Sequence, residues 1–192
     1  MGDLVLDLPW NDERSKRFIT NVGLITSVGP FGQNVMACEW THHVSYHPGL
    51  IAICLRPDEA THKNIKQTRE FGVNLCSTDQ SRMSSIAGAY TGAKFDKIKA
   101  LEDLGFKFYK GKKISAPMIH GASVNIECEL YKEIPLGDHT TFIGEVVEAS
   151  NNIEKEPLAY YDGKYFIMNT PVESPTYEER DNMGKIVEKY KK

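Results

Sequence analysis

The chain has 192 residues, a net charge of −3 at pH 7 and 41% hydrophobic residues, which favours one domain with a sizeable core. Acidic and basic residues are interspersed, so the sequence lacks the basic stripe of a nucleic-acid-binding protein. No apolar run approaches the roughly 20 residues that a membrane-spanning helix needs. Neither nucleic acid nor a membrane is therefore an expected partner.

Short strands alternate with turns in the first part of the chain. Five strands are expected, at residues 22–28, 35–40, 44–46, 50–55 and 71–76. The first is rich in β-branched residues and stops at a Gly-Pro pair, and the third is extended because a proline follows it closely. The fourth is almost entirely apolar, which predicts a strand buried on both faces.

Three helices are expected between the strands. The first begins near Asp58 or Thr61 and covers residues 63–69. The second follows a capping box in which Ser77 caps the helix and Gln80 reaches back to it. The third covers residues 95–104 and ends at a glycine in the expected C′ position.

The second half of the chain is more plainly β. Residues 123–134 alternate, with Val124, Ile126, Cys128 and Leu130 on one face and Asn125, Glu127, Glu129 and Tyr131 on the other. This pattern predicts a half-exposed antiparallel strand. Residues 140–149 and 165–168 add two more strands, and residues 176–192 have helical spacing with exposed charge. We therefore expect a mostly β protein, a small antiparallel barrel with helical insertions and a C-terminal helical tail.

Two segments carry groups that suit a cofactor with a planar ring and a phosphate. The run from Asn34 to Thr41 combines a polar donor, small residues, a thiol and an indole. The segment from Arg56 to Ile65 places Thr61 and Lys63 at the start of the expected helix. A helix N-terminus with a hydroxyl and a cation favours anion binding. The helix start at residues 77–82 is a second phosphate candidate.

These segments, together with Gly137–Val147, resemble the flavin reductase-like family of FMN-binding split β-barrels. The run Asn34–Trp40 corresponds to the family's small polar stretch, with Cys38 and Trp40 where serine or alanine and phenylalanine are commoner. Asp138, His139, Phe142, Gly144, Glu145 and Val146 match its D-H pair and following strand. The resemblance covers about residues 15–170 of a single domain, 1–192, and leaves residues 171–192 as a C-terminal extension.

The resemblance implies FMN as cofactor and NAD(P)H as co-substrate, in a homodimer with the flavin near the interface and an unknown electron acceptor. The ring would be held by Asn34, Met36, Ala37, Cys38, Glu39, Trp40 and Thr41. The phosphate would be held by Arg56, Thr61, Lys63 and Asn64, with Ser81 and Arg82 as weaker candidates. His139 would be the catalytic residue, at the nicotinamide site.

Each assignment has a plainer alternative. The run from Asn34 can be an ordinary core strand, Thr61 can merely cap a helix beside a solvated Arg56, and His139 can be a turn residue. At the level of function, the alternatives to a flavin reductase are a flavoredoxin-like electron carrier without NAD(P)H activity and a barrel module that binds no flavin.

Other chemistries find little support in the sequence. If residues 43–47 are extended, His43 and His47 stand roughly 13 Å apart, too far for one metal ion, and we expect none. No GxGxxG follows a strand, and neither a Walker loop nor a GxSxG elbow occurs.

The four cysteines are widely spaced, and three lie in apolar runs. This usage predicts reduced thiols in a cytoplasmic protein, because disulfide frameworks belong to small secreted chains. The N-terminal residues 1–9 carry acids and no positive region, which does not favour a secretory signal.

Overall fold

The computed structural model describes residues 6–191. Met1–Val5, part of the segment judged not to be a secretory signal, and Lys192 lie outside the described residues. The strands are β1 Thr20–Asn21, β2 Gly23–Ser27, β3 Asn34–Cys38, β4 Thr41–Tyr46, β5 Gly49–Leu55, β6 Glu70–Leu75, β7 Phe108–Lys110, β8 Pro117–Ile119, β9 Val124–Leu136, β10 His139–Asn151, β11 Ala159–Tyr161 and β12 Lys164–Phe166. The helices are α1 Ala60–Thr68, α2 Ser81–Ala89, α3 Lys97–Asp103 and α4 Tyr177–Glu188, with short 3₁₀ turns at Ser15–Arg17 and Thr78–Gln80.

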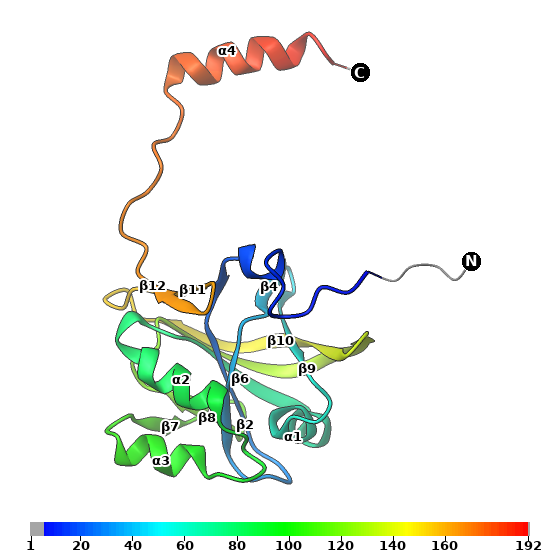
Figure 1. Ribbon diagram of the computed structural model, residues 1–192, viewed down its shortest axis with the longest axis vertical. Coiled ribbons are helices and arrows are strands. Elements are labelled where there is room, and N and C mark those ends of the chain that lie inside the picture. Colours follow the sequence, from blue (N-terminus) through cyan, green and yellow to red (C-terminus); the bar gives the residue numbers. More distant parts are fainter. Residues whose placement is uncertain (1–5, 192) are drawn as a thin grey trace, which may run out of the picture.

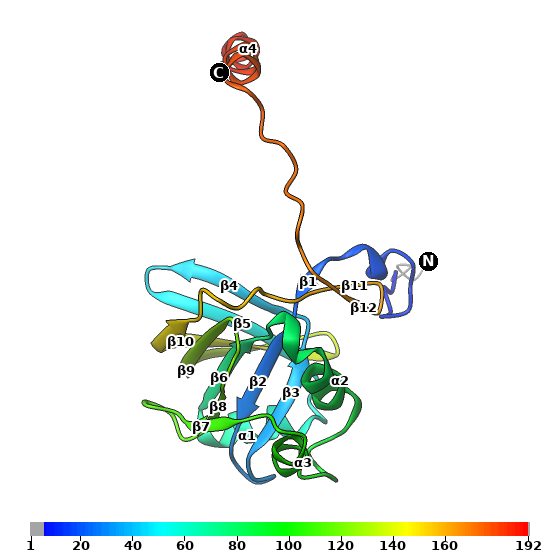
Figure 2. The same cartoon turned by 90° about the vertical axis from the view of Figure 1, so that its left-hand side faces the viewer.

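Seven strands form one antiparallel sheet in the order β3-β2-β6-β9-β10-β5-β4 (Figures 1 and 2). The two ends of this order, β3 and β4, are consecutive in the chain and are joined by Glu39 and Trp40. The amide of Cys54 in β5 donates to the Trp40 carbonyl at 3.1 Å, and the Cys38 thiol donates to the Cys54 carbonyl at 3.5 Å. The sheet therefore closes into a barrel that is split between β3 and β4, and the expected mostly antiparallel β fold is confirmed.

Two apolar cores hold the barrel and its helices together. One fills the barrel and includes the fully buried Phe71 and Phe142. The other lies between the β2–β3 side of the sheet and the helices α2 and α3, and it includes Met83 and Leu101. Figure 2 shows α2 and α3 beside β3, so the edge strand that carries the candidate ring-binding run is covered on one face by helices.

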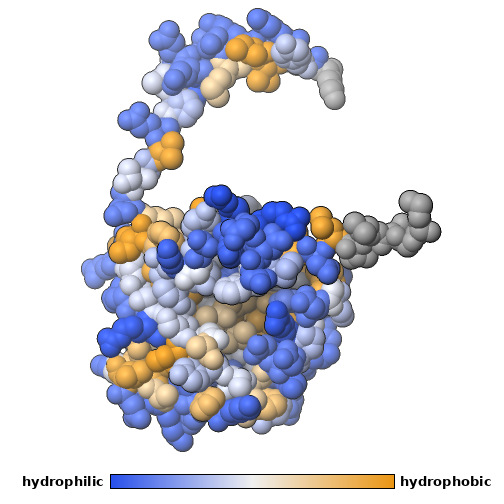
Figure 3. Space-filling view, in the orientation of Figure 1, coloured by the Kyte–Doolittle hydropathy of each residue, from blue (hydrophilic) through white to orange (hydrophobic). Residues whose placement is uncertain are grey.

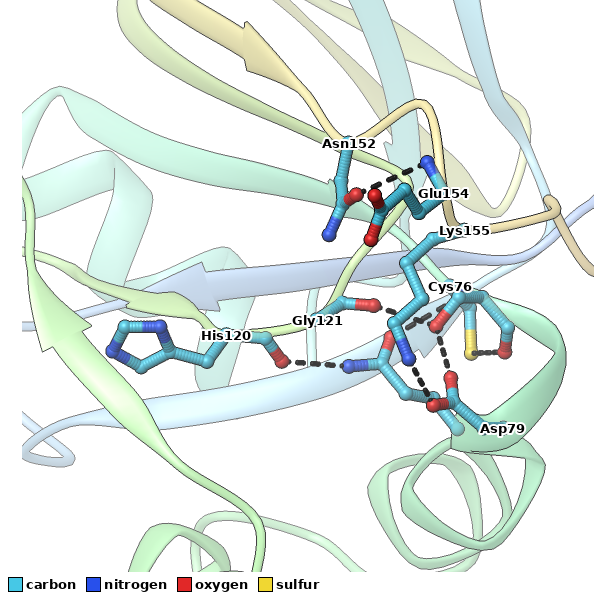
Figure 4. A network of polar contacts seen from close by, with 9 residues as sticks. Cys76, Asp79, His120, Gly121, Asn152, Glu154 and Lys155 are labelled. Atoms are coloured by element: carbon cyan, nitrogen blue, oxygen red, sulfur yellow. Dashed lines mark hydrogen bonds and ion pairs between the residues drawn. The ribbon is translucent and has the colours of Figure 1, made fainter.

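A network of polar contacts fixes the start of α2 (Figure 4). The Ser77 hydroxyl donates to the Gly121 carbonyl at 2.6 Å, and the Gln80 amide donates to the His120 carbonyl at 2.9 Å. Asp79 pairs with Lys155 in the loop after β10. The expected capping box of Ser77 and Gln80 is present, although it caps a 3₁₀ turn that leads into α2. These contacts tie α2 to two loops and so hold it against β3.

The burial predicted from the sequence was wrong for two strands. In β5, Ile51, Ile53 and Leu55 are buried, but the intervening side chains are only half-buried, because one face of this strand is incompletely covered. In β9 the polar side does not face solvent throughout, since Glu127 is buried. Its carboxylate accepts three backbone N–H groups from Lys112, Lys113 and Ile114, at 2.6–3.1 Å.

The tail of the chain stands apart from the barrel. The segment after β12 runs away from it in an extended conformation and ends in α4, as both views show (Figures 1 and 2). This helix confirms the expected helical tail. Within residues 6–191, no helix combines the length and the apolar character that crossing a membrane requires.

Candidate functional site

Trp40 and His139 lie together beside the end of β5, which pairs with β4 on one side and with β10 on the other. Trp40 lies in the link between these strands, and His139 is the first residue of β10, next to the end of β5. Their ring centroids are 4.7 Å apart with an interplanar angle of 43°. Trp40 is 47% exposed, so the pair forms an aromatic surface that is open to solvent.

Charged groups orient this pair. The Asp138 carboxylate lies 2.8 Å from the Nδ1 atom of His139, and this hydrogen bond lowers the pKa of Asp138. The positive charge of Arg56, at the end of β5, adds to the same effect. The three predicted residues Trp40, Arg56 and His139 therefore meet in one place, although they are far apart in the sequence. Because Nδ1 faces Asp138, Nε2 is the ring atom left for a ligand.

The middle of β3 presents little reactive chemistry of its own. Met36 and Ala37 are half-buried, and the Cys38 thiol is buried. Burial raises the pKa of Cys38 to about 11, so the thiol stays protonated and is a poor nucleophile. β3 is an edge strand whose second edge has no ladder partner in the sheet. Backbone N–H and C=O groups on that edge can bind the polar rim of a planar ligand.

Glu39 and Thr41 flank Trp40 and fix the link between β3 and β4. The Thr41 hydroxyl is buried and donates to the Cys38 carbonyl at 3.0 Å. Glu39 is half-buried, which raises its pKa, and its carboxylate accepts a bond of 3.4 Å from the Trp10 indole. These contacts hold Trp40 in place, so Glu39 and Thr41 act here on the backbone and on Trp10.

At the other end of β3, Asn34 is buried against the start of α1. Its amide nitrogen donates to the Thr61 hydroxyl at 2.8 Å, while its Oδ1 atom is buried and has no hydrogen-bond partner among the described residues. A Cβ atom on Gly92 would come within 2.3 Å of that oxygen, so only glycine leaves room there. An orphaned acceptor of this kind is costly unless a further group satisfies it.

The residues predicted to hold phosphate are divided between two environments. Thr61 is the second residue of α1, not its cap, and it is buried. Asn64 is also buried and binds the β2–β3 turn, through Ser27, Phe31 and Gly32. Both side chains therefore form their hydrogen bonds within the protein and do not face an open phosphate site.

Two of the predicted cations are solvent-exposed. Arg56 and Lys63 both reach solvent, with the Lys63 ammonium 5.5 Å from the centre of the Phe31 ring. A hollow of about 460 Å³, lined by Phe31, Gln33, Gly92 and Phe95 among others, adjoins this end of β3. Free cations are therefore available near both ends of the strand.

The remaining predicted residues lie apart from the Trp40–His139 pair. Ser81 and Arg82 form the first turn of α2, which is in contact with β12 through a 3.0 Å bond from the Tyr165 hydroxyl to Ser84. His42 and His43 lie on β4 and are exposed, as is His47 in the turn that follows. Across the described chain, no group of three or more His, Cys, Asp or Glu side chains could hold a metal ion.

Lys97 was not singled out from the sequence. It is 3% exposed, and its ammonium donates to the Ala87 carbonyl at 3.0 Å. Burial lowers its pKa to about 8, while the charge of Glu59 acts in the opposite direction. These partners place a buried cation between α2 and the start of α1. The signal in the sequence was a lysine directly beside Ile98 and near Leu101, the apolar positions of its helix.

These groups fit a planar cofactor with a polar rim and a phosphate. The exposed indole can cover one face of a ring, the free edge of β3 can bind its rim, and Arg56 or Lys63 can neutralise a phosphate. The orphaned Asn34 oxygen shows that hydrogen-bonding capacity at the start of β3 remains unused.

Comparisons with known proteins identify the family and the fold of the chain. An uncharacterized protein of Pyrococcus abyssi is 36% identical over 114 residues, 59% of this chain and 63% of that protein, so the match spans less than two thirds of this relative. The ferric-chelate reductase (NAD(P)H) of Archaeoglobus fulgidus is 32% identical over 139 residues, 69% of this chain and 76% of that protein. The crystal structure of flavoredoxin from Methanosarcina acetivorans superposes with a TM-score of 0.77 at 19% identity, covering 93% and 99% of the two chains, which shows the shared fold. The family model for the flavin reductase like domain matches residues 15–169, and the chain belongs to this family.

Proposed function

We propose that the chain binds FMN at the split between β3 and β4 and uses NAD(P)H to reduce it, passing the electrons to a separate acceptor. The observation that carries this proposal is the exposed Trp40–His139 pair beside the free edge of β3. A bound flavin supplies the redox chemistry itself, since it takes a hydride from a reduced nicotinamide and passes electrons on. The protein contributes binding, orientation and electrostatics.

Each residue of the site has a limited task in this proposal. The β3 edge around Met36–Cys38 binds the polar rim of the ring, and Trp40 covers part of a face. His139 presents its Nε2 atom to the nicotinamide or to a proton that must be held, while Asp138 fixes the orientation of the imidazole. The cation for the phosphate is Arg56 or Lys63, which lie near opposite ends of β3. Thr61 and Asn64 are retained as residues that position the segment around them.

The homodimer and the cytoplasmic location are also proposals. The strand β4 next to the site exposes Val44 and Tyr46, and Trp40 itself is half-exposed, which favours a partner surface over this face. All four cysteines are free, and three of them are buried. Unpaired thiols suit a reducing compartment.

The test is anaerobic stopped-flow mixing of the FMN-loaded protein with NADH and, separately, with NADPH. Loss of the yellow flavin absorbance with either nucleotide, much faster than for free FMN, is the expected result. A protein that binds FMN but is bleached by neither nucleotide is an electron carrier. A protein that neither becomes yellow nor quenches FMN fluorescence is a barrel module without flavin, and the proposal then fails entirely.

A further inference from the structure

Residues 167–191, the C-terminal arm, are exposed without exception. The arm consists of an extended linker, residues 167–176, and the helix α4, which contains no buried residue. In both views it projects away from the barrel on the side where β4 and the β1–β11–β12 sheet lie (Figures 1 and 2). The arm is therefore a large surface without a partner among residues 6–191 of its own chain.

The helix of the arm is nevertheless specified by local signals. Thr176 and Glu179 form a complete capping box, with bonds of 3.2 Å and 2.6 Å between side chain and backbone. Lys185 pairs with Asp181 one turn earlier at 2.6 Å. Yet α4 has only 12 residues, and isolated helices shorter than about 12–15 residues are marginal in water. The capping signals favour the helix, but a helix of this length becomes stable only when its apolar side packs on another surface.

One side of α4 is built for such a surface. Its apolar side chains Met183, Ile186 and Val187 follow the i, i+3, i+4 pattern of a helix face, and Tyr190, in the turn directly after the helix, continues the pattern at i+7. All are between 47% and 79% exposed, and Figure 3 shows apolar residues gathered along one side of the helix. The Asp181–Lys185 pair lies on the opposite side. The linker adds the exposed Ile167, Met168 and Val172.

Exposed apolar side chains also lie at the end of the barrel that faces the arm (Figures 1 and 2). We call this end the site face, and it comprises the N-terminal segment, residues 6–19, together with β4. Its exposed large apolar side chains, which lie among the charged residues of 12–17, are Leu6, Leu8, Trp10, Phe18, Ile19, Val44 and Tyr46. Exposed apolar groups gathered at one end of a protein and rimmed by polar residues are typical of interaction sites.

The length and direction of the linker favour a second copy of the chain, rather than the same chain, as the surface that covers α4. Ten residues span at most about 36 Å, and Pro171 and Pro175 favour an extended chain. The linker carries α4 outward from its own site face. A second copy that faces the first across a two-fold axis presents its own site face to that helix, and the same contact then forms twice. One arrangement thereby covers both exposed surfaces on both chains.

We propose that the C-terminal arm is exchanged between two copies of the chain, with the apolar side of α4 packed on the site face of the second copy. This inference rests on the homodimer proposed above and specifies the surfaces that form it. Because the site face adjoins Trp40, the exchanged arm also covers the open side of the Trp40–His139 pair and excludes water from it.

The test is photo-crosslinking of the full-length protein without flavin. Val187 is replaced by p-benzoyl-phenylalanine, and ¹⁴N- and ¹⁵N-labelled chains are mixed and re-equilibrated before irradiation. We expect a product of twice the 21.6 kDa chain mass, with isotopically mixed peptides that join α4 to residues 6–19 or 41–46. The same photoreactive group at Lys185, on the opposite side of the helix, should give at least about fivefold less product. Crosslinks within one chain, crosslinks to another surface of the second copy, or no crosslink would each overturn the inference.

Sedimentation of point variants gives an independent measurement. Val187→Asp should weaken the dimer by about tenfold or more, because charged substitution at an apolar contact is costly. Lys185→Ala changes the net charge by the same amount on the opposite side of the helix and should leave the dimer unchanged. If Val187→Asp and the unmodified protein form equally stable dimers, the arm does not hold the interface. Flavin titration of the same samples reports separately on the proposed function.

Discussion

The ring centroids of Trp40 and His139 lie 4.7 Å apart beside the end of β5. Trp40 directly precedes β4 and His139 opens β10, and both of these strands pair with β5, so the strand order β10-β5-β4 brings the two rings together. The pair places the indole of Trp40 next to the imidazole of His139. Both lie near the edge of β3 that has no ladder partner in the sheet. Each feature is ordinary alone, and their coincidence supports a flavin site.

Removing the indole should weaken flavin binding. Trp40→Ala is expected to lower the affinity for FMN by about tenfold, the upper range for loss of one aromatic contact. Trp40→Phe keeps a flat ring and should stay within about threefold of the unmodified protein. Quenching of FMN fluorescence during titration measures both. Trp10→Phe is the control, since it changes the other tryptophan near Glu39, and a loss of affinity there equal to that of Trp40→Ala would contradict the assignment.

His139 should affect the reduction step more than binding. His139→Gln is expected to slow reduction by NAD(P)H by about 100-fold, at the lower end for loss of a general acid or base. FMN affinity should change by less than about threefold. Stopped-flow rates and flavin titrations separate the two effects. His120→Gln alters a histidine whose ring lies against Tyr109 outside the site, and it should leave both quantities unchanged. Equal losses in the two variants would point to a general loss of structure.

Thr61 should matter through Asn34. Thr61→Val removes the hydroxyl that accepts the Asn34 amide and leaves that buried amide unpaired, which should cost about 1–3 kcal/mol in the free energy of unfolding. Thr61→Ser retains the hydroxyl and should cost less than half as much. Urea denaturation measures the difference. Equal stability of the Val and Ser variants would show that the hydrogen bond contributes nothing.

The buried Glu127 carboxylate should be a major support of the loop before β8. Glu127→Gln offers one acceptor oxygen where two serve three backbone N–H groups, so we expect a loss of about 2–4 kcal/mol in unfolding free energy. Glu129→Gln, at an exposed position two residues later on the strand, should change it by less than about 0.5 kcal/mol. Urea denaturation at neutral pH compares them, and similar midpoints would refute this role of Glu127.

Lys97 should make the stability depend on alkaline pH. Burial lowers its pKa from 10.5 to about 8, so between these values the unfolded chain holds the proton more tightly than the folded one. The contribution of Lys97 to the unfolding free energy therefore rises with pH across this window. Lys97→Met removes the buried charge and should be more stable than the unmodified protein by about 2–3 kcal/mol at pH 7, with the gap closing towards pH 10.5.

The exposed Lys99 supplies the control for that experiment, because Lys99→Met should alter stability little at either pH. The unfolding free energies of the variants are compared at the same pH. The contributions of the thiols, which titrate in the same alkaline range, then cancel. A gap for Lys97→Met that does not narrow with rising pH would mean that Lys97 is not held as described.

Much of the fold was predictable because local sequence patterns identify most of its longer strands. Residues 22–28 are rich in β-branched residues and residues 71–76 are mostly apolar, and both segments are strands in the structure, within one or two residues. The three-residue strands β7 and β8, and the pairing of β1 with β11, were missed. Segments of two or three residues are too short to show a period of two, and they are held by partners distant in the sequence.

The site was predictable in part for a similar reason. Trp40, Arg56 and His139 came from a resemblance of ordered motifs, and the structure brings them together. Lys97 and the burial of Glu127 depend on which helix or loop covers a strand, and no local pattern encodes that coverage. The same applies to Asn64. Its polar side chain was predicted to bind a ligand, but its hydrogen bonds are made to the end of β2 and the β2–β3 turn.

The most direct test of the central claim is a crystal structure of the full chain grown with FMN. The account predicts planar density along the free edge of β3, with Trp40 and His139 at its border and the phosphate near Arg56 or Lys63. Flavin density in another place, such as the hollow of about 470 Å³ beside Tyr109 and His120, with β3 and Trp40 left untouched, would contradict it.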